Sequence, residues 1–61
     1  MMRRYIKGEL VRYSTFEYPF RIKALEGGNV AWIVETYATK YVAGGRVARV
    51  MRVPISQLQP V

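Results

Sequence analysis

The stretch RVARVMRVPISQLQPV, residues 46–61, decides the fold because it divides into a strand, a short helical turn and a closing strand. Residues 54–58 are typical of a single 3₁₀ turn, which Ser56 can cap while Leu58 plugs the end of a small barrel. Residues 59–61 are expected to form a terminal edge strand, where Pro60 is tolerated because one side of such a strand needs no donor.

Residues 46–53 are predicted to be the strand that precedes this turn. Extended geometry places Val47, Met51 and Val53 on one face, and Arg49 falls on that same face, which indicates an edge position or a bulge. The arginines recur at every third position, so a helix is the alternative. The flanking glycines and proline, together with the valines, favour the strand.

Residues 30–39 (VAWIVETYAT) are predicted to be another strand, but two registers remain open. One points Val30, Trp32 and Val34 inward. The other points Ala31, Ile33 and Tyr37 inward. Both faces are apolar near the middle, so the outward face becomes an exposed apolar patch and a candidate interface. Trp32 is expected to fill the core.

Residues 20–25 (FRIKAL) show the clearest alternation in the chain, with Phe20, Ile22 and Ala24 on the inner face of a half-buried strand. Residues 26–29 (EGGN) predict a tight hairpin, because Gly-Gly and Asn supply positive φ angles. Residues 40–45 (KYVAGG) predict a second turn with the glycine pair at its tip.

The amino-terminal part predicts a first core strand at residues 9–13 (ELVRY), in which Leu10 and Val11 are apolar. Residues 14–19 (STFEYP) predict a loop whose two aromatic residues form either a lid over the core or a contact surface. A strand can begin at Tyr5 and Ile6, and residues 1–4 are expected to be flexible.

The predicted elements amount to an all-β fold of about five strands with a 3₁₀ turn before the last one. The opening Gly8-Glu9-Leu10-Val11 and the tail Val53-Pro54…Leu58-Gln59-Pro60 resemble the corresponding parts of SH3-like barrels, in particular the short YodC-like barrels of bacteria, plasmids and phages. This resemblance implies one SH3-like small barrel over residues 1–61. Type II dihydrofolate reductases have a similar tail, but the Val-Gln-Ile-Tyr segment that they carry is replaced here by residues 50–53.

The composition of this 61-residue chain limits the classes of function that it can have. A domain this short buries only about 60% of its unfolded surface, so self-association is a plausible aid to stability. The chain has no Cys, His or Asp, which removes the common nucleophiles, general bases and metal ligands. We therefore expect a protein that is not an enzyme and that needs no cofactor or metal.

The charge is strongly positive, with ten Lys and Arg residues against four Glu, giving a net charge of +6. An excess of this size favours a polyanionic partner. Cations interleaved with aromatic rings are how proteins hold single-stranded nucleic acid. The candidate nucleic-acid-binding residues are Arg21, Lys23, Arg46, Arg49, Arg52, Tyr18, Tyr37 and Tyr41.

The alternative is a protein-interaction or self-associating module, in which the basic residues are incidental. Its candidate interface residues are Trp32, Tyr37 and Phe16. No apolar run approaches the roughly 18 residues that a membrane span needs. The first seven residues lack the apolar segment of a signal peptide, so a cytoplasmic protein without a membrane partner is expected.

Overall fold

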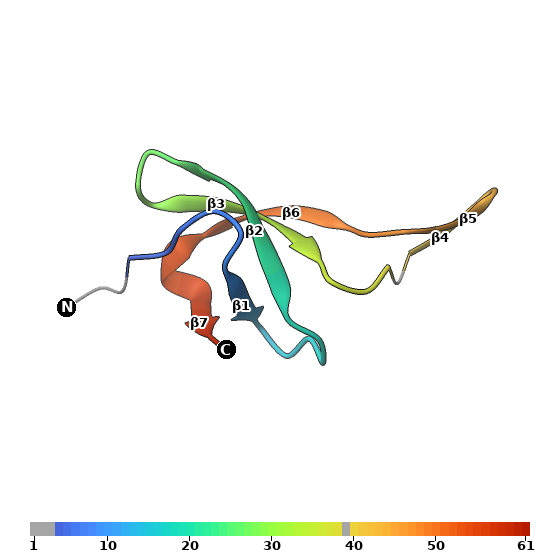
Figure 1. Ribbon diagram of the computed structural model, residues 1–61, viewed down its shortest axis with the longest axis horizontal. Helices are drawn as coiled ribbons and strands as arrows, with labels where there is room; N and C mark the ends of the chain where they lie inside the picture. The colour runs from blue at the N-terminus through green and yellow to red at the C-terminus, as the bar shows by residue number, and fades with distance from the viewer. Residues whose placement is uncertain (1–3, 39) are drawn as a thin grey trace.

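The computed structural model describes residues 4–38 and 40–61 and has an all-β fold (Figure 1). The expectation of flexibility at residues 1–3 lies outside the described residues. Residues 46–53 contain no helix, so the extended alternative is confirmed. The elements in chain order are β1 (Leu10–Tyr13), β2 (Phe20–Glu26), β3 (Val30–Glu35), β4 (Lys40–Val42), β5 (Gly45–Val47), β6 (Val50–Pro54), the 3₁₀ turn η1 (Ile55–Gln57) and β7 (Leu58–Pro60).

Five strands form one antiparallel sheet in the order β6-β3-β2-β1-β7. The last strand returns to pair with the first, with Leu58 opposite Tyr13 and Pro60 opposite Val11. This confirms the terminal edge strand. In the part of the chain that the structure describes, no pairing joins β6 to β7, and no closed barrel is found.

The 3₁₀ turn lies where the sequence predicts it, although its capping differs. Pro54 occupies the N-cap position, and no side chain caps the turn, so the prediction for Ser56 is wrong. Ser56 is exposed. The amide of Ile55 instead donates to the carbonyl of Asn29 at 2.9 Å, which ties the turn to the hairpin between β2 and β3.

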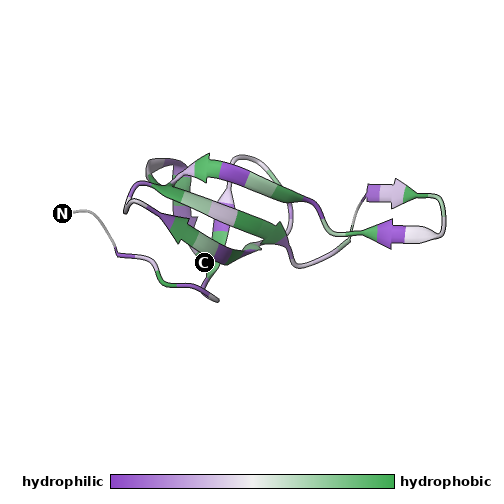
Figure 2. Cartoon of the chain, turned by 90° about the horizontal axis from the view of Figure 1, so that it is seen from above, coloured by the Kyte–Doolittle hydropathy of each residue, from purple (hydrophilic) through white to green (hydrophobic). Residues whose placement is uncertain are grey.

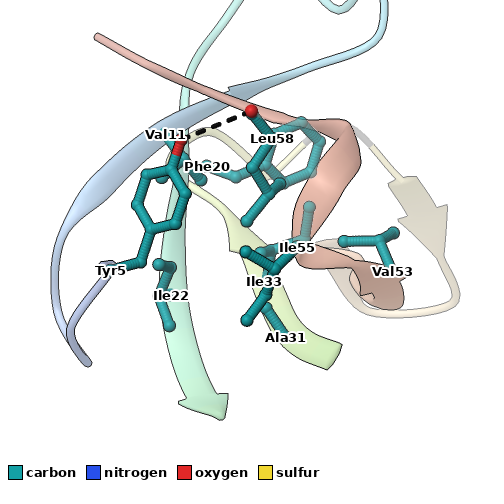
Figure 3. Packing of buried hydrophobic residues seen from close by; sticks show 9 residues of the cluster. All are labelled: Tyr5, Val11, Phe20, Ile22, Ala31, Ile33, Val53, Ile55 and Leu58. Atoms are coloured by element: carbon teal, nitrogen blue, oxygen red, sulfur yellow. Dashed lines mark hydrogen bonds between the residues drawn. The ribbon is translucent and has the colours of Figure 1, made fainter. Parts of the chain in front are cut away.

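The core is a single apolar cluster that β1, β2, β3, β6 and the 3₁₀ segment enclose (Figure 3). Tyr5 covers one side and donates its hydroxyl to the carbonyl of Leu58 at 3.3 Å. Tyr5 therefore belongs to the core without forming a strand. The buried residues are Tyr5, Val11, Phe20, Ile22, Ala31, Ile33, Val53, Ile55 and Leu58.

The register of β3 is settled by this core. Ala31 and Ile33 are fully buried, so the second of the two predicted registers is correct in the middle of the strand. Tyr37 lies beyond the end of β3 and is 59% exposed, so it does not follow that inner face. Trp32 points to the opposite side and is absent from the core cluster, so its expected role as core filler is wrong.

A bulge in β2 corrects one further prediction. The pairing of β2 with β3 shifts between Ile22 and Ala24, which leaves Lys23 as the extra residue. An extra residue reverses the alternation of faces, so Ala24 pairs with Trp32 on the outer face and is only partly buried. The same shift brings Glu26 onto the outer face, where the indole of Trp32 donates to it at 2.7 Å.

The molecule is elongated because β4 and β5 form a two-stranded ribbon that projects from the sheet (Figures 1 and 2). The chain measures 43 × 22 × 16 Å, and its radius of gyration of 11.9 Å exceeds the roughly 10.5 Å of a compact chain of this length. We call residues 40–47 the arm. All of its residues are exposed.

The arm replaces two predicted elements. Residues 40–45 were expected to be a turn, but 40–42 form a strand, and the turn is confined to the tip before Gly45. Residues 46–53 were expected to be one strand, but the chain leaves the ladder at Ala48 and Arg49, so β5 and β6 are separate. No helix among the described residues is long and apolar enough to cross a membrane.

Candidate functional site

The base of the arm is fixed to the sheet by Glu35 and Arg49. The amide of Glu35 donates to the carbonyl of Arg49 at 3.0 Å, and the amide of Arg49 donates to the Glu35 carboxylate at 2.7 Å. The guanidinium adds contacts from Nε at 3.1 Å and Nη2 at 3.3 Å. The Glu35 side chain is only 7% exposed whereas the Arg49 side chain is 41% exposed, so the carboxylate of this ion pair is shielded from water and the guanidinium is not.

The loop between β1 and β2 packs against this ion pair through Phe16. The Arg49 guanidinium lies 5.3 Å from the centre of the Phe16 ring, within cation–π range. Phe16 also meets Phe20 edge to face at 5.2 Å and stacks on Tyr13 at 6.1 Å. Phe16 therefore acts as the lid over the core, the first of the two roles considered for the loop aromatics.

The second loop aromatic, Tyr18, contacts the arm side instead. Its ring lies 4.4 Å from that of Tyr37, centre to centre, and both rings remain about half exposed. Beside them, the amide and the hydroxyl of Thr36 donate to the carbonyl of Pro19 at 3.4 and 2.7 Å. These contacts hold the loop against the segment that leads from β3 into the arm, and they leave part of each ring surface accessible.

Within the arm, cross-strand pairing places Tyr41 and Arg46 on one face. The Arg46 guanidinium lies 5.8 Å from the centre of the Tyr41 ring, which is 76% exposed. Lys40 pairs with Val47 on the other face. The arm therefore presents a ring–cation pair on one side and a cation beside apolar side chains on the other.

Two hollows lie along this line of residues. The first, which we call the root pocket, has a volume of about 190 Å³ and is lined by Phe16, Glu17, Tyr18, Pro19, Phe20, Glu35, Tyr37 and Arg49. The second, the arm recess, is wider and more open at about 570 Å³, and is lined by Tyr18, Thr36, Tyr37, Ala38, Tyr41 and Arg46. Tyr18 and Tyr37 line both hollows, so the two are adjacent, and we refer to them together as the groove.

The charge along the chain is uneven. Residues 36–61 contain four cations (Lys40, Arg46, Arg49, Arg52) and no acid, so their formal charge is 4 − 0 = +4. Residues 1–35 contain six cations and four acids, which leaves 6 − 4 = +2. Most of the net charge therefore belongs to the arm and the strand that follows it.

Several predicted cations are engaged within the protein. Arg52 pairs with Glu26 at 3.0 Å on the outer face, where both side chains are about half exposed. The hydrogen bond from Trp32, and next that from Arg52, lower the pKa of Glu26 below its ordinary value of 4.5. Arg21 donates to the carbonyl of Gly8 at 2.6 Å. Each of these contacts limits how far the side chain can reach toward a ligand.

The structure thus divides the predicted site residues into two groups. Arg21, Lys23, Trp32 and Arg52 lie on β2, β3 and β6, outside the groove. The groove brings the other group together: Phe16, Tyr18, Tyr37, Tyr41, Arg46 and Arg49.

Sequence reasoning missed the groove residues Glu17, Glu35 and Thr36, and also Lys40 on the arm. The symmetric placing of Lys40-Tyr41-Val42 and Gly45-Arg46-Val47 about a glycine-containing tip was the signal for a hairpin.

No group of acidic side chains among the described residues could hold a metal ion. Comparison with family models, curated proteins and solved structures finds no match to this chain.

Proposed function

We propose that this protein is a small, non-enzymatic nucleic-acid-binding module with an SH3-like fold, and that a strand binds along the groove and the arm. The fold assignment rests on the strand order β6-β3-β2-β1-β7 and on the 3₁₀ turn before the last strand. The function rests on one observation: three exposed rings, Tyr18, Tyr37 and Tyr41, line the two adjacent hollows, and the Arg46 cation lies beside them on the arm.

This arrangement suits single-stranded nucleic acid. Unpaired bases expose flat faces, and stacking on an aromatic side chain contributes about 1–3 kcal/mol per base. Tyr37 and Tyr41 offer such surfaces, since they are 59% and 76% exposed. Arg46, which lines the arm recess beside these rings, supplies positive charge for the phosphates. Lys40, on the other face of the arm, adds to its positive potential.

Fluorescence anisotropy with labelled mixed-sequence oligonucleotides at two salt concentrations tests the proposal. Arg46→Gln should weaken binding and lower the magnitude of the salt slope by about 0.7 for a single strand. Tyr37→Leu should weaken binding roughly 5- to 100-fold if one base stacks there. Lys7→Gln removes the same charge from an exposed turn near the amino terminus and is the matched control. Absent or salt-insensitive binding would reject the proposal.

A protein-interaction or self-associating role is the second candidate, and the arm itself favours it. A two-stranded ribbon is marginally stable alone in water, and Val42 and Val47 are 44% and 42% exposed on this one. Light scattering after gel filtration, across a range of protein concentrations, tests self-association. If the chain self-associates through the arm, Val47→Ser should lower its mass, and a monomer at all concentrations would reject self-association. A pull-down that recovers no partner protein would count against the wider protein-interaction role.

A further inference from the structure

We propose that the root pocket receives a single nucleobase of the bound strand, and that Glu17 selects bases that present the N4 amine of cytosine or the N6 amine of adenine. This inference rests on the proposed function, because it requires a nucleic-acid strand in the groove. It adds a specificity to that function, namely a preference for cytosine and adenine over thymine and uracil at one position.

The size and walls of the root pocket fit one planar heterocycle. Pockets for drug-sized ligands have volumes of about 300–1,000 Å³, so 190 Å³ leaves room for a smaller group. The walls are mainly the rings of Phe16, Tyr18, Phe20 and Tyr37, together with Pro19. Protein sites for unpaired bases have this character, with aromatic surfaces for stacking and few polar groups for the base edge.

The polar groups of the pocket have the wrong sign for a phosphate. Glu17 and Glu35 both line it, in a chain whose net charge is +6. The Arg49 guanidinium already pairs with Glu35. Among the described residues, Glu17 accepts no hydrogen bond, and it is exposed at the pocket rim. A carboxylate only accepts hydrogen bonds, so the ligand group that meets Glu17 must be a donor.

Nucleobases differ in that group. Cytosine presents its N4 amine and adenine its N6 amine, whereas thymine presents the O4 carbonyl, and carboxylates in proteins accept from the amine of cytosine. A carbonyl opposite Glu17 would place two acceptors together. The phosphates on either side of this base would lie outside the pocket, toward Arg46, which lines the adjoining arm recess.

A cation of a partner protein is the other group that an aromatic, carboxylate-lined pocket could hold. The Arg49 guanidinium lies 5.3 Å from the Phe16 ring and binds Glu35, so this chain already supplies a cation there. The positive charge of residues 36–61 would also repel such a partner. Both observations favour the neutral base.

The test measures the affinities for equal-length homopolymers of deoxycytidine, deoxyadenosine and deoxythymidine at one salt concentration. The native chain should prefer the cytosine and adenine strands to the thymine strand by roughly 5- to 100-fold, the range for a discriminating base contact. In Glu17→Gln, the amide can donate as well as accept, so the ratio should fall to near one. Glu26→Gln makes the same charge change on the outer sheet face and should retain the native ratio.

The outcomes separate the two proposals. If no homopolymer binds, the proposed function itself fails. If all three bind equally, or if Glu17→Gln keeps the native preference, nucleic-acid binding stands and the base-selective pocket is wrong. Glu17 and Glu26 are both exposed, so circular dichroism should show both Gln variants folded. Each variant also gains one unit of positive charge, which should strengthen binding to all three homopolymers alike and leave the ratio of their affinities unchanged.

Discussion

Replacing Arg49 and Arg52 separately by leucine compares how much stability comes from an ion pair with a buried carboxylate and from one with an exposed carboxylate. Each arginine pairs with a glutamate of the sheet, Arg49 with Glu35 on β3 and Arg52 with Glu26 on β2, and both substitutions remove one positive charge. The partner of Arg49, Glu35, is 7% exposed, whereas the partner of Arg52, Glu26, is 47% exposed. The burial of the carboxylate is therefore the main variable.

The expected magnitudes follow from that burial. In Arg49→Leu, the Glu35 carboxylate loses the Nε and Nη2 donors and keeps the backbone amide at 2.7 Å. A shielded charged acceptor left underpaired costs about 1–3 kcal/mol. In Arg52→Leu, water replaces the lost donors, so the cost should be about 0–1 kcal/mol. A change of 1 kcal/mol moves the melting temperature of so small a domain by about 4–8 °C.

Thermal unfolding followed by far-ultraviolet circular dichroism measures both variants against the native chain. We expect Arg49→Leu to melt several degrees below Arg52→Leu. The Glu35→Gln/Arg49→Leu double variant should recover part of the loss, because the amide needs no counterion. Equal melting temperatures for the two single variants would refute the claim that the base of the arm is held by a shielded ion pair.

Three further predictions concern the core, the arm and the outer face. Ile33→Ala should lower the free energy of unfolding, measured with urea, by about 2–5 kcal/mol, because Ile33 is fully buried. This is much of the roughly 3–9 kcal/mol total free energy of unfolding expected for a chain of 61 residues. Gly45→Ala should raise amide hydrogen exchange in the arm while leaving the melting temperature nearly unchanged, since φ is +138° at Gly45 and the arm buries nothing. The lowered pKa of Glu26 makes its contribution to stability present above its ordinary value of 4.5 and lost as the pH falls through the folded-state value. The melting temperatures of the native chain and Glu26→Gln should therefore converge as the pH is lowered, and a constant difference across the pH series would contradict this.

The carboxy-terminal tail was predictable because each of its signals is local. Pro54 ends one strand, the next three residues form the 3₁₀ turn, and Leu58 to Pro60 pair with β1. The alternation in the first half of β2, where Phe20 and Ile22 are buried, was likewise predictable. So was the Gly27-Gly28 hairpin, where both glycines adopt positive φ angles. Local backbone chemistry decided these elements, and the structure agrees with them.

The errors arose where pairing between distant segments decides the outcome. The bulge at Lys23 depends on how β2 meets β3, and it moves Ala24 to the outer face. The same pairing places Trp32 beside Glu26, where a hydrogen bond holds the indole outside the core. A large aromatic residue in a strand carries no local signal that separates these two faces.

The placing of two glutamates explains why some of the predicted cations are engaged within the protein. Glu26 and Glu35 each neutralise an arginine that the sequence alone marks as free, so Arg52 and Arg49 help to hold the sheet and the base of the arm. Lys40 and Arg46 have no acid among residues 36–61 to pair with, and they lie on a ribbon that buries nothing. The arm therefore carries positive charge that no nearby acid in its own stretch of sequence neutralises, which suits the proposed binding of a polyanion.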